Sequence, residues 1–153
     1  MDRIRNLPLG AKLVLAGGPL LFLNLSFTWQ RLEVDFGPAG RAERLLDGWD
    51  LLGLLVGVLA LGLVVYVVVA YLTDVEPSDE LPWDTVALAA GAAVFLLTVL
   101  KNLTDAGSTL PSYVGVGLAA VVAAGVLLEW RDARGEARPP LGRLRTRQLS
   151  RDA

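Results

Sequence analysis

Four long stretches of the chain contain no Asp, Glu, Lys or Arg, and they restrict the fold more than any other feature of the sequence. They cover residues 13–29, 51–72, 86–100 and 113–128 of a 153-residue chain. Each approaches the ~20 residues that a helix needs to cross a hydrocarbon core about 30 Å thick. Because these runs are continuous rather than alternating, they favour helices over the strands of a barrel. The sequence therefore predicts an all-α membrane protein, a four-transmembrane-helix bundle.

Flanking residues extend these runs to the boundaries that we expect for the spans. The spans are predicted at about 9–29, 49–72, 83–101 and 112–130. Residues 1–130 then form one transmembrane domain, and residues 131–153 form a separate tail. A cleaved signal peptide is the alternative for the first run, but no small-x-small cleavage site follows it, which favours a retained helix.

The distribution of basic residues predicts which side of the membrane each end of the bundle faces. With four spans, both termini lie on one side and carry ten of the fourteen Lys and Arg residues, against four in the loops opposite. Cytoplasmic segments carry such an excess of Lys and Arg. All four tryptophans lie at ends of the apolar runs, where aromatic belts form. We expect a multi-pass protein of the cell membrane with cytoplasmic N- and C-termini.

Small and polar residues within the spans indicate where the helices pack, because lipid provides no hydrophobic drive for helix association. Gly53 and Gly57 form a small-xxx-small pair in the second span, and Ala119 and Ala123 form one in the fourth. Asn24 lies near the end of the first span, where we expect a hydrogen bond to another helix. Contact with a ligand is the alternative for Asn24.

Two charged residues lie at the same depth at the ends of neighbouring spans. Asp50 begins the second span and Lys101 ends the third. Charged residues at membrane depth are favoured when they pair. The sequence therefore predicts an outer ion pair between Asp50 and Lys101.

Residue types that carry catalysis or bind cofactors are scarce. The chain has no cysteine and no histidine, which excludes disulfides, thiol redox chemistry and imidazole ligands for haem or zinc. It also has no zinc-protease, nucleophile-elbow or phosphate-loop motif. We therefore expect no catalytic residue, no cofactor and no metal site, and predict that the protein is not an enzyme.

Residues 30–48 form the largest predicted outer loop, and their pattern differs from that of the spans. Leu32, Val34 and Phe36 alternate with charged residues, which indicates a half-buried strand lying over the helix ends. A lone strand is unstable, so its partner would be residues 102–112 or another subunit. An irregular loop is the alternative.

A short amphipathic helix is predicted to follow this strand and to complete a small outer cap. Gly37 and Pro38 interrupt the strand, and proline suits the first turn of a helix. Apolar residues then recur at helical spacing, at Ala42, Leu45, Leu46 and Trp49. We expect this helix to lie at the membrane interface.

The arrangement resembles the claudin-type tetraspan plan, with four spans, internal termini and a first outer loop that contains a strand. Trp29, Gly48 and Trp49 are similar to the Trp…Gly-Leu-Trp signature of that family. The cysteine pair that follows the signature and its middle Leu are absent, and the loop is shorter. The whole chain also resembles small four-span bacterial membrane proteins of unassigned function. Both resemblances imply a topology and no activity.

The tail after Trp130 is basic, with seven Arg against three acidic residues. Polybasic segments beside a membrane gain about 1 kcal/mol per charge from anionic lipid. The residues predicted to face the lipid are Arg143, Arg145 and Arg147. Nucleic-acid binding is not expected, because the tail has no aromatic residue for stacking on bases.

These features favour an integral membrane interaction or assembly protein over one with chemistry of its own. Its expected partners are the lipid bilayer and either another membrane protein or a second copy of itself. The predicted outer interaction surface consists of Leu32, Val34, Phe36, Arg41 and Arg44. A small oligomeric channel or permease is the alternative, and a membrane enzyme ranks third. A channel would need a polar path, but the polar residues of the spans all lie in their outer halves.

Overall fold

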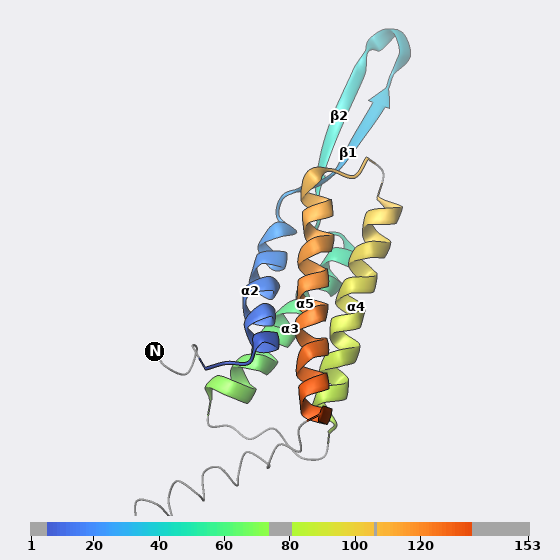
Figure 1. Ribbon diagram of the computed structural model, residues 1–153. Helices are drawn as coiled ribbons and strands as arrows, with labels where there is room; N and C mark the ends of the chain where they lie inside the picture. Colours follow the sequence, from blue (N-terminus) through green and yellow to red (C-terminus); the bar gives the residue numbers. More distant parts are fainter. Residues whose placement is uncertain (1–5, 74–80, 106, 136–153) are drawn as a thin grey trace, which may run out of the picture.

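The computed structural model describes residues 6–73, 81–105 and 107–135 of the chain. This part is mostly helical, with four α-helices and one two-stranded sheet (Figure 1). The elements follow in the order α2 (Leu9–Asn24), β1 (Thr28–Asp35), the short 3-10 helix η1 (Gly37–Ala39), β2 (Arg41–Asp47), α3 (Leu51–Leu72), α4 (Trp83–Thr104) and α5 (Leu110–Gly135).

Three of these helices are long and apolar enough to cross a membrane. They are α3 and α4, with 22 residues each, and α5, with 26. A helix of 22 residues is about 33 Å long, which matches the hydrocarbon thickness of a bilayer. Helix α2 is also apolar but has 16 residues. The molecule therefore has the character of a membrane protein, with three helices that could cross a bilayer.

The first apolar run ends its helix earlier than the sequence indicates, at Asn24 rather than Trp29. The chain turns after Leu25 and enters β1 at Thr28. Trp29, which the apolar pattern places at a membrane interface, is fully buried instead. Its indole N–H donates to the backbone oxygen of Asn24 at 3.0 Å, which ties the start of the strand to the end of the helix.

The predicted strand is present, but the predicted interfacial helix after it is wrong. Residues 41–47 form β2, which pairs antiparallel with β1 in a register that places Leu32 opposite Arg44. The chain reverses between the strands through two glycines with positive φ, Gly37 at 62° and Gly40 at 103°. Pairing with β1 satisfies the backbone groups of residues 41–47, although their apolar spacing indicated a helix.

The partner of the predicted strand therefore lies within the same loop. The described residues among 102–112 contribute one isolated bridge to it, between Gln30 and Ser108. The two strands form a hairpin that projects from one end of the bundle, well beyond the connection between α4 and α5 (Figure 1).

The four helices surround one core of small and medium apolar side chains. Helix α5 packs against α2 and α4, and α3 packs against the same two helices. Fully buried members of the core come from every helix, among them Val14, Ala60, Val94, Ala119 and Val122. This arrangement holds the hairpin and the adjoining helix ends at one end of the bundle (Figure 1).

Candidate functional site

The hairpin exposes apolar side chains that no other described element covers. Leu32 and Val34 alternate with charged residues and share one face with Ala42, which lies opposite Val34. Val34 is 45% exposed and Phe36 is 59% exposed, whereas Leu32 is half-buried. The expectation that this face lies over the helix ends is therefore wrong. Because β2 supplies the missing ladder partner, the hairpin can extend away from the bundle.

The opposite face of the hairpin carries charge. Arg31 Nε lies 2.5 Å from Glu43 Oε1, and Arg41 Nε lies 3.3 Å from Asp35 Oδ2. All four side chains are largely exposed, so each pair contributes little to stability. Glu33 lies directly opposite Glu43, and like charges in that position destabilise a strand pair.

The register separates the two arginines of the predicted interaction surface. Arg41 lies on the charged face, opposite Asp35. Arg44 lies opposite Leu32 and therefore shares the apolar face. The surface predicted from sequence thus divides into an apolar face that includes Arg44 and a charged face that includes Arg41.

Backbone hydrogen bonds attach the base of the hairpin firmly to the bundle. The Arg31 N–H donates to Gly107 O at 3.0 Å, and the Thr109 N–H donates to Trp29 O at 3.1 Å. On the other strand, the Gly48 N–H donates to Leu25 O at 2.8 Å. The hairpin is therefore held at both strands, and its tip is the part that projects.

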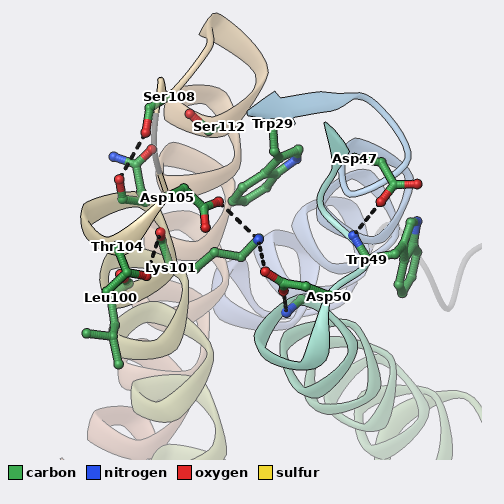
Figure 2. A network of polar contacts seen from close by, with 12 residues as sticks. Trp29, Asp47, Trp49, Asp50, Leu100, Lys101, Thr104, Asp105, Ser108 and Ser112 are labelled. Atoms are coloured by element: carbon green, nitrogen blue, oxygen red, sulfur yellow. Dashed lines mark hydrogen bonds and ion pairs between the residues drawn. The ribbon is translucent and has the colours of Figure 1, made fainter. Parts of the chain in front are cut away.

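A buried lysine lies beneath this base and joins two helices (Figure 2). Lys101 Nζ, on α4, donates to Asp50 Oδ2 at 2.6 Å, so the ion pair predicted from sequence is present. The same Nζ lies 3.0 Å from Asp105 Oδ2 and 5.5 Å from the centre of the Trp29 ring. The Lys101 side chain is completely buried, which makes these countercharges necessary.

Sequence reasoning did not identify Asp105 as a partner of Lys101. Its side chain is 6% exposed, far less than the 45% of Asp50. Lys101 and Asp105 are four residues apart, a spacing at which charged side chains on a helix meet, so the signal was available. Asp105 caps the end of α4 and keeps a carboxylate against the buried ammonium group.

Asp50 also caps α3. Its Oδ1 accepts a hydrogen bond from the Gly53 N–H at 2.8 Å. Partial burial raises the pKa of Asp50, but the hydrogen bond and charge of Lys101 and the Gly53 N–H outweigh it and leave the pKa below 3.8. The carboxylate is therefore charged and serves both the lysine and the helix N-terminus.

Asn24 is buried but does not make the expected interhelical hydrogen bond through its side-chain oxygen. Among the described residues, Asn24 Oδ1 has no hydrogen-bond partner. It faces Gly115 on α5, where an added Cβ would lie 2.8 Å from it and 2.4 Å from the Trp29 ring. Asn24 and Trp29 thus pack closely against the α5 backbone.

The small residues predicted to pack helices have different roles. Gly57 faces the Trp49 ring, at 3.0 Å from an added Cβ, whereas Gly53 faces the backbone carbonyl of Gly48. Ala119 is fully buried and Ala123 is half-buried. Helices α2 and α5 approach closely at a pair that the sequence analysis did not single out, Gly10 and Gly125, where a Cβ added at Gly10 would lie 2.4 Å from Gly125 O.

A second polar group joins helices at the opposite end of the bundle. Glu129 Oε1, on α5, accepts the Ala11 N–H of α2 at 3.1 Å, and its Oε2 accepts the hydroxyl of Tyr71 from α3. Pro8, the N-cap residue of α2, accepts no hydrogen bond through its side chain, so Glu129 accepts a hydrogen bond from the first turn of the helix in its place.

Within the described ranges, no group of three His, Cys, Asp or Glu could hold a metal ion. Arg143, Arg145 and Arg147 lie outside the described residues.

Comparisons with protein-family models, curated proteins and solved structures found no match to this chain.

Proposed function

We propose that this chain is an integral membrane interaction or assembly protein that presents its hairpin to a partner and carries out no chemistry of its own. One observation supports the proposal above all others: the hairpin projects from a packed bundle with apolar side chains exposed. Burying a side chain such as Val34 or Phe36 gains about 1.5–3 kcal/mol. A partner that covers both gains this energy without reorganising the bundle, because the hairpin base is already held.

The proposed topology is a tetraspan protein of the cell membrane, with the hairpin outside and both termini in the cytoplasm. It rests on the ten basic residues near the termini against four at the end of the bundle that carries the hairpin, three in the hairpin and Lys101 in α4. In this topology α2 also crosses the membrane, as the first span of the chain. Its 16 residues are about 24 Å long, and the bilayer adapts to such a length by local thinning. The lipid bilayer and one further membrane protein, or a second copy, are the partners.

The test places a photo-crosslinking phenylalanine analogue at Phe36 and, as a control, at Asp132 near the far end of α5. Both positions are exposed. In native membranes, the probe at Phe36 should give one discrete crosslinked product, and the probe at Asp132 should not give that product. The protein that is crosslinked should also co-purify with the unmodified chain from a mild detergent.

A matched set of variants separates recognition from folding. With the probe moved to Pro38, replacing Leu32, Val34 and Phe36 together with serine should abolish the crosslink and leave the unfolding temperature of the bundle unchanged. Asn24→Leu should leave the crosslink intact, because Asn24 is buried below the hairpin. If the serine variant crosslinks as well as the wild type, or if purified protein gives a liposome flux that Asn24→Leu removes, the proposal is wrong.

A further inference from the structure

The β1 strand has a free edge beyond its attachment to the bundle. The backbone groups of Arg31 point away from β2, because its N–H donates to Gly107 O. In an antiparallel ladder this direction alternates, so the N–H and C=O of Glu33 and Asp35 point outward as well. No hydrogen bond to those four groups is present within the described ranges. Two backbone N–H groups and two backbone C=O groups therefore lie in a row along this edge and face water.

The bundle already uses the lower part of this edge to hold an extended segment. Gln30 and Ser108 form an antiparallel bridge, and hydrogen bonds on either side of it join Arg31 to Gly107 and Trp29 to Thr109. Figure 1 shows the hairpin continuing past this segment. An open groove lies where the edge becomes free, lined by Arg31, Glu33 and residues 107–110. A strand bound in the groove would continue, along the same edge of β1, the antiparallel pairing that residues 107–109 make with it.

The charges along the edge select what can pair with it. Arg31 and Asp35 have ion-pair partners within the hairpin, whereas Glu33 has none in the described part of the chain. Glu33 also lies opposite Glu43, so a cation beside it would relieve a like-charge contact. Pairing between the β1 edges of two copies would instead bring Glu33 against Asp35 or against another Glu33. The edge therefore discriminates against a second copy.

We infer that the free edge of β1 at Glu33–Asp35 binds an extended segment of another protein as an added strand, with a Lys or Arg opposite Glu33 and apolar neighbours beside it. In that register the basic side chain lies on the charged face of the hairpin. The neighbouring residues lie on the other face, next to Leu32 and Val34. This inference rests on the proposed function and specifies how the hairpin would recognise its partner.

The experiment titrates the full chain in detergent micelles with a short peptide and records backbone amide shifts by NMR. The probe is the capped peptide acetyl-Thr-Val-Lys-Val-Thr-amide. One control carries Glu in place of Lys, and another carries an N-methyl group on the Lys amide. The N-methyl control retains the side chains and the charge but cannot donate to the Glu33 carbonyl. We expect the Glu33 and Asp35 amides to shift with the Lys peptide, and each control peptide to bind at least tenfold more weakly.

Variants of Glu33 separate the backbone contribution from the charge. Glu33→Pro removes an N–H that no ladder bond uses, so the Leu32 and Val34 amides should stay protected from exchange. Glu33→Gln keeps the N–H and removes the charge. Glu33→Pro should lose at least tenfold in affinity, Glu33→Gln should no longer distinguish the Lys from the Glu peptide, and Glu33→Lys should prefer the Glu peptide.

Several results would overturn the inference. They are the absence of shifts with the Lys peptide, binding that is insensitive to N-methylation or to Glu33→Pro, and self-association that depends on Glu33. These results leave the proposed function intact if Phe36 still crosslinks to a partner in native membranes. If edge binding occurs but no crosslink forms in native membranes, the proposed function fails and the edge property remains.

Discussion

Lys101 carries a charge at a fully buried position and therefore needs countercharges close to it. Its ammonium group is completely buried, and it is stabilised by Asp50, Asp105 and the Trp29 ring (Figure 2). An unpaired charge in such a place costs several kcal/mol, whereas a paired one is close to neutral. The pairing of Lys101 with Asp50 and Asp105 therefore acts mainly by fixing the geometry of the bundle. It fixes the start of α3 and the end of α4 together beneath the base of the hairpin.

Removal of the lysine should destabilise the bundle, because it leaves a buried carboxylate without its countercharge. Lys101→Met leaves Asp105, which is 6% exposed, without a countercharge, and we expect a loss of about 3 kcal/mol. The double variant Lys101→Met with Asp105→Asn removes the stranded charge and should recover part of that loss. Thermal unfolding in detergent measures both variants. Equal stability of the single and double variants would show that Asp105 does not need the lysine.

Stability should depend on pH through Asp50. Its folded pKa lies below 3.8, so the charged carboxylate stabilises the fold fully above pH 3.8, and this contribution is lost as the pH falls through the folded pKa. Asp50→Asn keeps a good helix cap and removes only the charge. The unfolding temperature of wild type should exceed that of Asp50→Asn at pH 6, and the difference should shrink below pH 3.8. A constant difference from pH 6 to pH 3 would contradict this assignment.

At the scale of elements, the glycines separate into those that allow helix contact and those that face outward. An added Cβ at Gly125 would lie 2.8 Å from Gly10 O and 3.0 Å from Leu13 Cβ, whereas one at Gly117 on the same helix meets nothing within 4 Å. The approach of α2 to α5 thus depends on the absence of side chains at one point. Small residues serve this purpose in helix packing within lipid.

Gly125→Ala should therefore destabilise the contact between α2 and α5. We expect a loss of about 1–3 kcal/mol from overpacking, measured by thermal unfolding in detergent. Gly117→Ala is the matched control and should be neutral or stabilising by up to about 1 kcal/mol, because alanine is the better helix former. Equal effects of the two substitutions would show that α2 and α5 do not approach closely at Gly125.

At the scale of the whole molecule, the hairpin and the end of α5 lie at opposite ends of the bundle (Figure 1). The chain has no cysteine, so single cysteines introduced there are unique probes of sidedness. With the proposed orientation, an impermeant thiol reagent should label Pro38→Cys in intact cells. It should label Asp132→Cys only after the membrane is opened. The reverse pattern would place the hairpin in the cytoplasm.

The apolar runs, the ion pair and the strand could be predicted from the sequence because each depends on a local signal. A run without charge favours a long helix, since backbone groups in an apolar environment must bond within their own segment. The first run is the exception, because its helix ends at Asn24 and the run continues into β1. Asp50 and Lys101 are charged residues at matching ends of two neighbouring apolar runs. The alternation of Leu32, Val34 and Phe36 has the period of a strand.

Only the tertiary structure decided what these elements pair with. The apolar spacing of residues 41–47 indicates a helix, but the reversal at Gly37 and Gly40 brings them against β1 as a strand. Exposure of Val34 and burial of Trp29 follow from the direction in which the hairpin leaves the bundle. Which strands pair, where the hairpin points and where two helices approach closely all depend on contacts between separate segments of the chain. The apolar period of a single segment carries no information about these contacts.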